Sequence, residues 1–463
     1  MRVVLADLKG RSGIVTKDTV VGGYGSRLEP FTKVTHVFAQ MKHRFHDVPS
    51  VMMGYLAAIF AADGHEVRWT RDEPVDGDVA VVLSSLVDHR HETEWARGMR
   101  SRGVKVGFVG LAASKMPELF LPHADFVING EPEEAIIRLS KGQPLTGFCA
   151  SEPIADLDAL PFPRWDLISE RPSRAVAVPF AGRPLGGGFP LLASRSCPEF
   201  CTYCPHRVLA PYRSRSAANV ADELEALCDR YKKPYVIFRD PLFTQDRDRC
   251  EALCYEIMRR ELRLRFECET RLDRLDPQLI DLLQAAGLRT VSFGVESVSP
   301  DTLKRVGRRP TPEVHQRAII EHCHRRDVVT AAFYVLGFLE DDRESIAATV
   351  EYAVDLGSTF AQFKLLTPYP ATPLWKKMAP LVAEQDWEKF DGYTPVFTHP
   401  RLSAQELKVL LGAAYRAFYM RPSYLATYLH LRNRRVLDLV DWLDRMVAEH
   451  HDRDLVEALA GAC

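Results

Sequence analysis

Residues 191–216 have the sequence LLASRSCPEFCTYCPHRVLAPYRSRS, in which three cysteines fall within eight residues. Cys197, Cys201 and Cys204 follow the spacing C-x3-C-x2-C, directly after a short strand-like apolar run. Thiolates at such short spacing are typical ligands of iron–sulfur clusters or zinc. A structural zinc site needs a fourth ligand, and His206 lies closer to Cys204 than zinc ligands usually do. Three thiolates instead leave one iron of a cluster open to a substrate or cofactor.

Strand-like runs and helical stretches alternate on both sides of these cysteines. Upstream, five runs within the first ~150 residues predict a doubly wound α/β domain with a parallel sheet. Downstream, six runs predict a partial (β/α)6 barrel, with its chemistry at the ends of the strands. The downstream runs are PLLASRS, PYVIFRDP, LRFECETR, TVSFGVES, VVTAAFYVLGF and FAQFKLLTPYP.

The chain divides by composition into four parts. We expect a doubly wound domain over 1–148, a linker rich in Pro, Arg and Gly over 149–188, the barrel over 189–376, and a mainly helical region over 377–463 that packs on the barrel or covers its mouth. A long insertion at 9–48 follows the first strand, and loops of that length are usually functional.

Composition excludes several classes of partner. The 463 residues carry a formal net charge of -2, with Lys and Arg spread along the chain, so we expect no nucleic-acid partner. No apolar run approaches the ~20 residues that cross a bilayer, and the start MRVVLADLKGRSG lacks the pattern of a secretory signal, so we expect a cytoplasmic protein without a membrane partner. Ten cysteines in a reducing compartment favour metal binding or catalysis where they cluster.

The cysteine motif carries a family resemblance. Cys197, Cys201, Tyr203 and Cys204 match the C-x3-C-x-aromatic-C signature of radical S-adenosylmethionine (SAM) enzymes, and the six β/α units resemble their partial barrel. The resemblance implies that the three thiolates bind a 4Fe–4S cluster whose open iron chelates SAM. It also implies an electron donor such as flavodoxin or ferredoxin, cleavage of SAM to a 5′-deoxyadenosyl radical, and a position for Tyr203 near the adenine.

Polar residues at the ends of the later strands resemble cofactor-contacting positions of that superfamily. Carboxylates there can accept amino and hydroxyl hydrogens, and Arg271 can hold the methionine carboxylate bidentately. We expect Asp240 and Glu269 to be catalytic. The alternative is that such residues form surface ion pairs at strand ends, which are common in barrels. The expected cofactor-binding residues are Tyr203, Asp240, Arg271, Glu296, Ser297 and Gly337.

A doubly wound domain before such a barrel resembles the cobalamin-binding subgroup of this superfamily. The D-x-H-x-x-G motif with its axial histidine is missing, because the first strand ends in Asp7-Leu8-Lys9-Gly10. LSSL at 83–86 resembles the serine loop that meets the nucleotide tail of cobalamin. The glycine pair near the fourth strand is reduced to Gly110 followed by Leu111, whose bulk argues against cobalamin.

These departures leave alternative functions open. The length, the altered glycine loop and the charged strand ends resemble radical SAM dehydratases of aminoglycoside antibiotic biosynthesis. Our first expectation is therefore a dehydratase, a lyase that removes a hydroxyl from a polar, cationic aminoglycoside such as paromamine; the charged strand-end residues suit the proton transfers of dehydration. The alternative is a cobalamin-dependent radical SAM methyltransferase. A non-catalytic iron–sulfur or zinc scaffold is the third, and it would not need Asp240, Arg271 and Glu296 around the cluster.

Overall fold

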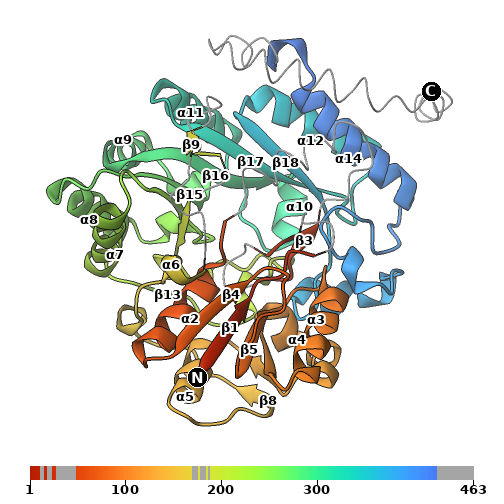
Figure 1. Ribbon diagram of the computed structural model, residues 1–463. Coiled ribbons are helices and arrows are strands. Elements are labelled where there is room, and N and C mark those ends of the chain that lie inside the picture. The colour runs from red at the N-terminus through yellow and green to blue at the C-terminus, as the bar shows by residue number, and fades with distance from the viewer. Residues whose placement is uncertain are drawn as a thin grey trace, which may run out of the picture.

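Two six-stranded parallel sheets form the frame of the computed structural model (Figure 1). The structure describes residues 1–10, 15–17, 23–27, 48–168, 176–177, 184–185 and 188–424. Parts of the predicted insertion and linker, and all of the chain beyond 424, therefore lie outside the described residues. None of the helices in this described part combines the length and apolar composition needed to cross a bilayer.

The first sheet has the strand order β4-β1-β5-β6-β7-β8. All its strands are parallel, and the order in which strands are added switches from one side of β1 to the other between β4 and β5. Its central strands are buried because helices cover both faces. All five predicted runs are strands, and the doubly wound prediction is confirmed. The elements are β1 Arg2–Ala6, β4 Glu66–Thr70, β5 Val79–Leu83, β6 Lys105–Val109, β7 Phe126–Asn129, β8 Gly147–Ala150, and the helices α2 Val51–Ala62, α3 His89–Ser101, α4 Leu111–Lys115 and α5 Glu133–Ser140.

Sequence periodicity misses three features of this sheet. It does not show that helix α3 begins as early as His89, because three polar residues precede the apolar pattern. Strand β8 runs through the boundary expected at 148, since it pairs with β7 despite its exposed side chains. The insertion contains a hairpin of β2 Val15–Thr16 and β3 Ser26–Arg27. Strands of two residues are too short to show an alternating pattern in the sequence.

The second sheet keeps the order of the chain, β11-β14-β15-β16-β17-β18, and its first and last strands do not pair. It is therefore an open barrel of six β/α units, as predicted. The strands are β11 Phe189–Leu191, β14 Tyr235–Phe238, β15 Arg265–Thr270, β16 Leu288–Glu296, β17 Val329–Leu336 and β18 Phe360–Leu365; the helices are α7 Ala217–Arg230, α8 Arg247–Arg259, α9 Pro277–Ala286, α10 Pro300–Arg305, α11 Glu313–Arg325, α12 Arg343–Leu356 and α13 Pro373–Met378.

Short polar residues mark where the barrel helices begin. The side chains of Ser216, Asp246, Asp276 and Asp342 each accept a hydrogen bond from a backbone N–H in the first turn of α7, α8, α9 and α12 respectively. Such caps satisfy donors that have no partner inside the helix. Each helix therefore starts a few residues after the end of the preceding strand, and this leaves the strand ends free to form a site.

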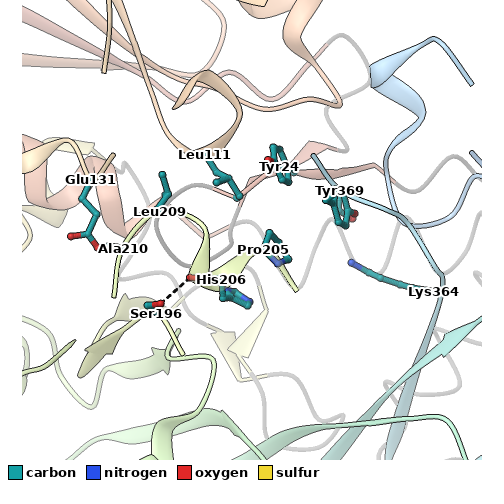
Figure 2. Close-up of a pocket in the computed structure, with 13 residues that line it drawn as sticks. Tyr24, Leu111, Glu131, Ser196, Pro205, His206, Leu209, Ala210, Lys364 and Tyr369 are labelled. Atoms are coloured by element: carbon teal, nitrogen blue, oxygen red, sulfur yellow. Dashed lines mark hydrogen bonds between the residues drawn. The ribbon is translucent and has the colours of Figure 1, made fainter. Parts of the chain in front are cut away.

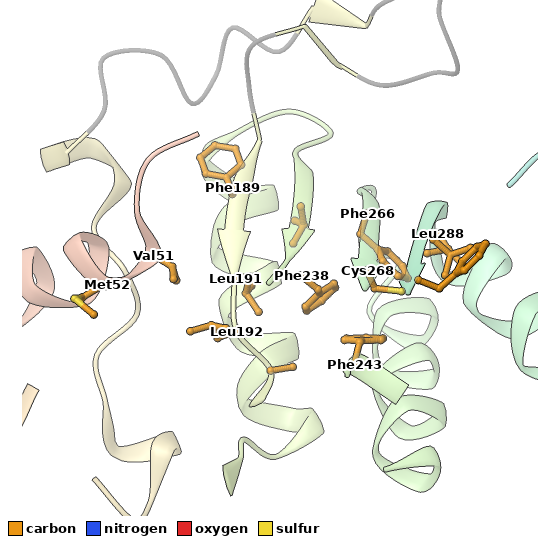
Figure 3. Close-up of a cluster of buried hydrophobic side chains, with 14 of the residues drawn as sticks. Val51, Met52, Phe189, Leu191, Leu192, Phe238, Phe243, Phe266, Cys268 and Leu288 are labelled. Atoms are coloured by element: carbon orange, nitrogen blue, oxygen red, sulfur yellow. The ribbon is translucent and has the colours of Figure 1, made fainter. Parts of the chain in front are cut away.

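The two sheets share one hydrophobic core. Val51 and Met52 of α2, a helix of the first sheet, lie beside Leu191 and Leu192 at the edge strand β11 of the second (Figure 3). All four side chains are at most 3% exposed. Helix α2 thus covers the open side of the barrel next to β11, and the carboxyl ends of both sheets face a common space.

The opposite edge of the barrel is covered by α14 Ala404–Tyr419 (Figure 1). The Tyr419 hydroxyl accepts from the N–H of Ala361 at 3.0 Å and donates to its carbonyl at 2.7 Å, and Tyr415 bonds Phe363 in the same way at 3.2 and 2.9 Å. Four residues of helix rise about 6 Å and two residues of strand about 6.6 Å, so the spacings match. Side chains thus replace a neighbouring strand along β18.

The region from 377 is less helical than expected before α14. In its described part, residues 382–403 contain a single 3-10 turn, because Gly392, Pro395 and Pro400 interrupt helix formation. Helix α14 packs against β18 and α12, so it covers the sheet edge and not the mouth of the barrel.

Candidate active site

The three cysteines lie in one loop that a small hairpin closes. Strands β12 Ser194–Arg195 and β13 Arg213–Ser214 pair antiparallel at the end of β11, and residues 196–212 form the loop between them. Ser196 has a φ of 66°, a left-handed backbone conformation that is rare outside glycine. This turn directs the chain away from the strand immediately before Cys197.

Two other parts of the barrel fix the loop. The N–H of Thr202 donates to the Val306 carbonyl at 2.8 Å, and the Thr202 carbonyl accepts from the N–H of Leu374 at 3.0 Å. Gly307 has a φ of 73°, and a Cβ there would lie 2.4 Å from the Phe200 carbonyl oxygen. Only glycine permits this approach, so the turn after α10 sets the position of the cysteine loop.

The sulfur donors fit an iron–sulfur cluster better than a single metal ion. All three thiols are half-buried in one loop. In the described residues, no three His, Cys, Asp or Glu side chains gather closely enough to hold one ion. A cluster differs from zinc in this respect, because each thiolate binds its own iron and the sulfurs need not converge. The Arg308 Nη1 atom lies 3.8 Å from Cys201 Sγ and adds a cationic donor to the site.

Glu296 and Arg308 form a buried pair beside the cysteines. Arg308 Nη1 lies 3.6 Å from Glu296 Oε1, and its Nη2 donates to the Gly294 carbonyl. Burial raises the pKa of Glu296, and the nearby guanidinium opposes that shift. Glu296 also has a φ of 68°, and such strained residues concentrate at functional sites. The sequence predicted Glu296 but not Arg308, which follows a helix in VGRRP and so lacks the strand-end signal.

The Arg271 fork is occupied within this structure, and its expected role toward the methionine carboxylate stays a prediction. Its Nε and Nη2 atoms donate to the two carboxylate oxygens of Asp273 at 2.8 and 2.9 Å, so Asp273 occupies the fork expected to hold the methionine carboxylate. The carboxylate two residues along the chain was not weighed in that prediction. The buried Nη1 atom alone has no hydrogen-bond partner among the described residues. Arg271 therefore has one donor left for a ligand.

Asp240 holds the backbone and is sealed from solvent. One carboxylate oxygen accepts from the N–H of Ala193 at 3.0 Å and the other from the Ser194 hydroxyl at 2.5 Å. The residue is 0% exposed. It thus positions the strand that leads into the cysteine loop, and this geometry gives no support to its predicted proton-transfer role.

Three further predicted residues lie around the barrel mouth in different ways. Ser297 is buried, and its hydroxyl accepts from the N–H of Ser299 at 3.2 Å. Gly337 has a φ of 81°, but the close neighbour that excludes a side chain there is Leu407 of α14. Glu269 is half-buried and lies on the inner face of β15, since it alternates with residues that pack in the core. Glu269 is thus the better placed of the two predicted catalytic carboxylates.

Tyr203 lies on the cysteine loop and points to the end of β17. Its ring meets Phe338 edge-on with centroids 6.2 Å apart. Its buried hydroxyl faces Glu296, and hydrogen bonding from Tyr203 acts to lower the pKa of that carboxyl against the effect of burial. The expected place of Tyr203 near the adenine stays a prediction.

A pocket lies where the two carboxyl edges meet (Figure 2). Tyr24 lines it from the hairpin of the insertion, Leu111 from the start of α4, His206 from the cysteine loop, and Lys364 and Tyr369 from β18 and the loop after it. Burial, and to a smaller degree Arg239, lowers the pKa of His206 to about 4, so this imidazole is neutral. The rings of Tyr24 and Tyr369 stack at 5.3 Å and join the two walls.

The cobalamin motifs of the first sheet have different fates. Leu111 follows Gly110 and lines the pocket, so its side chain occupies space that a second glycine would leave empty. The predicted serine loop is not free, because Ser84 donates to the Val109 carbonyl at 2.8 Å and Ser85 donates to Glu92 at 2.6 Å. The sequence pattern alone does not show these internal partners.

Comparison with known proteins finds a family match within the barrel. Residues 191–353 match the Radical SAM superfamily. Members of that superfamily use a 4Fe–4S cluster and SAM as cofactors. The fold of nearly the whole chain resembles TsrM, a radical SAM methyltransferase of Kitasatospora setae solved with cobalamin and a 4Fe–4S cluster (TM-score 0.63, 15% identity, 91% of this chain and 89% of that one).

Relatives by sequence are named as methyltransferases and cyclases. An uncharacterized methyltransferase of Pyrococcus horikoshii is 28% identical over 84% of this chain and 87% of its own length. The bacteriochlorophyllide d C-12(1)-methyltransferase of Chlorobaculum tepidum is 29% identical over 47% of this chain and 48% of its own. An anaerobic magnesium-protoporphyrin IX monomethyl ester cyclase of Rubrivivax gelatinosus is 28% identical over 60% and 49%. The chain thus spans about half of the latter two proteins.

Proposed function

We propose that this chain is a cobalamin-dependent radical SAM methyltransferase acting on a small molecule. The observation that carries the proposal is the pocket between the two carboxyl edges, which one wall of the first sheet and the cysteine loop build together. A cofactor held there lies beside both the cluster ligands and the barrel mouth. The fold likeness to TsrM and the methyltransferase names among the relatives support the same activity.

The residues divide into two groups in this proposal. Cys197, Cys201 and Cys204 hold the cluster, and Arg308 donates to one of its thiolates. Glu296 is placed to receive the amino group of SAM at the end of β16. When bound, the cluster supplies the electron that cleaves SAM and cobalamin carries the methyl group. Leu111, His206 and Tyr369, which line the pocket, would hold the corrin ring.

Dehydration of an aminoglycoside, our first expectation from the sequence, is the less favoured function. It requires a base and an acid that reach the substrate. Asp240, one of the two expected carboxylates, is fully buried and bonded to backbone. The relatives described above are methyltransferases and cyclases, with no dehydratase among them.

Reaction products separate the two functions without knowledge of the substrate. The reconstituted protein is incubated anaerobically with SAM and a reductant, with and without hydroxocobalamin. A methyltransferase forms S-adenosylhomocysteine that depends on the corrinoid, whereas a dehydratase forms 5′-deoxyadenosine alone. Corrinoid-independent 5′-deoxyadenosine without any S-adenosylhomocysteine contradicts our proposal.

The cluster assignment has its own test. We predict that Cys201→Ala abolishes both the formation of 5′-deoxyadenosine and the visible absorbance of the reconstituted cluster. The reason is that the two remaining thiolates bind only two of the four irons and do not retain the cluster. Cys228→Ala, which removes another half-buried thiol, is the matched control and retains both. Full cleavage activity in the Cys201 variant rejects the assignment.

A further inference from the structure

Doubly wound folds bind their ligands in a crevice at the carboxyl ends of two neighbouring strands, at the point where the order of strands switches side. Here these strands are β1 and β5. Asp7 and Lys9 follow the first of them, and Ser84, Ser85 and Asp88 follow the second. The side chains that meet in this crevice belong to the protein itself.

Lys17 fills the crevice. It comes from the insertion after β1 and is 1% exposed, although it is a lysine. Its ammonium lies 2.6 Å from Glu92 Oε1 and donates to the carbonyl of Leu83, the last residue of β5, at 3.0 Å. The ammonium thus caps the central strand at the place where a ligand would enter.

Most of the surrounding groups are bonded within the protein, although Asp88 Oδ2 has no hydrogen-bond partner among the described residues. Ser85 donates to Glu92, while Ser84 donates to Val109 and accepts from the N–H of Ala113 at 2.9 Å. Lys9 lies 3.0 Å from Asp7 Oδ2 and adds a second ion pair. A ligand entering the crevice would separate buried charges from their partners, which is costly because each would remain unpaired in a low dielectric.

The hairpin of the insertion closes the crevice from outside. The N–H of Leu86 donates to the Tyr24 carbonyl at 2.8 Å. Gly25 has a φ of 85°, and a Cβ there would lie 2.9 Å from Val87 Cγ2. The same hairpin presents the Tyr24 side chain to the interface pocket. It therefore seals one site and builds the wall of another.

We propose that this chain binds a corrinoid by its ring in the pocket between the two sheets, and that the crevice between β1 and β5 does not admit the nucleotide tail. This rests on the proposed function and adds how the cofactor is held. Affinity then comes from contacts of the corrin with pocket residues such as Leu111 and Tyr369. Cobinamide, which has the ring but no nucleotide, should bind as tightly as cobalamin.

Two corrinoids test the inference on the wild-type protein. Hydroxocobalamin and diaquacobinamide are titrated separately into the full chain after anaerobic cluster reconstitution, and binding is followed by absorbance after gel filtration. We expect dissociation constants within about threefold of each other. Cobalamin binding at least tenfold tighter overturns the inference alone. Failure of both to bind overturns the proposed function and the inference together.

A pocket variant locates the site independently. Leu111→Trp narrows the pocket, and it should weaken both corrinoids by the same factor, at least tenfold. Val409→Trp, at an exposed position of α14, is the control and should leave both unchanged. A Leu111 variant that weakens cobalamin but not cobinamide would place the nucleotide in this pocket and reject the inference.

Discussion

Arg308 contacts three groups: the thiol of Cys201, the carboxylate of Glu296 and the backbone carbonyl of Gly294. Its donation to Cys201 is a charge-assisted hydrogen bond to a group that is a thiolate when it binds iron. Hydrogen bonds to cluster sulfurs stabilise the reduced state, because that state is more negative. In the site proposed above, Arg308 would therefore raise the cluster potential, an effect at the scale of one residue.

We predict that Arg308→Lys lowers the midpoint potential of the reconstituted cluster by roughly tens of millivolts, because lysine keeps the charge beside Glu296 but lacks the planar fork that reaches Cys201. Redox titration followed by electron paramagnetic resonance measures the shift. Arg274→Met is the control, since Arg274 pairs with Glu199 in the same loop at 3.1 Å. An unchanged potential in the Arg308 variant would give this residue a purely structural role.

Asp88 makes stability depend on pH. Burial, together with Glu92, raises its pKa to about 8, although Lys17 opposes the shift. An unfolded Asp titrates near 3.9. Folding therefore takes up a proton at neutral pH, so this contribution to stability is fully present below about pH 4 and is lost as the pH rises to about 8.

We predict that Asp88→Asn removes this slope and is more stable than the wild type at pH 8.5, by roughly 1–3 kcal/mol, because no charge is then buried. Urea unfolding of the apoprotein between pH 5 and pH 9 measures the difference. Exposed Asp76→Asn should keep the wild-type slope. A parallel pH profile for wild type and Asp88→Asn would contradict the prediction.

Some site residues could be predicted from the sequence and others could not. The cysteines could, because their ligand spacing is local. Asp240 and Arg271 were placed correctly at strand ends, but their partners in the fold, the Ala193 backbone and Asp273, decide what they do. Lys17 carries no signal in the sequence, because its role depends on a crevice formed by strands far along the chain.

At the scale of elements, the last barrel strand, β18, has its free backbone groups hydrogen-bonded by tyrosine side chains of α14. We predict that Tyr419→Phe lowers the free energy of unfolding by roughly 1–3 kcal/mol, because the N–H and carbonyl of Ala361 lose their partner while the ring packing stays. Urea unfolding measures the loss. Tyr255→Phe, at an exposed tyrosine of α8, should be neutral, and an equally neutral Tyr419 variant would show that water replaces the hydroxyl.

The regular elements followed from the sequence more fully than the irregular ones. Alternating runs identified every strand of both sheets except β8, whose exposed side chains give it no apolar period. Hairpin β2–β3 and strands β12 and β13 have two residues each, too few for any pattern. These short elements nevertheless shape the interface pocket and the cysteine loop.

At the scale of the whole molecule, buried ion pairs join the first sheet to the cysteine loop. Glu131 and Glu133, after β7, face Arg195 and Arg213 of the hairpin that closes the loop. Arg195 Nη2 lies 2.7 Å from Glu133, and Arg213 Nη2 lies 2.6 Å from Glu131. Arg195 also lies over the ring of Tyr55 in α2 at 4.9 Å. Movement of either sheet would strain this network.

We predict that Glu133→Gln lowers the free energy of unfolding by roughly 3–5 kcal/mol, because it leaves the buried Arg195 charge without its closest partner. The double variant with Arg195→Met should recover part of the loss. Arg247→Met, which removes an exposed ion pair with Glu251, should cost at most about 1 kcal/mol. Additive losses in the double variant would show that the two charges do not interact.

The covering of β18 by the tyrosines of α14 has a consequence for folding during synthesis. Helix α14 follows β18 in the sequence, so the strand leaves the ribosome before the side chains that cover it. Until α14 docks, β18 exposes a row of unpaired backbone groups, and such a row recruits strands from other molecules. Aggregation during synthesis should therefore be a hazard for variants that weaken α14 docking, even where the finished enzyme tolerates them.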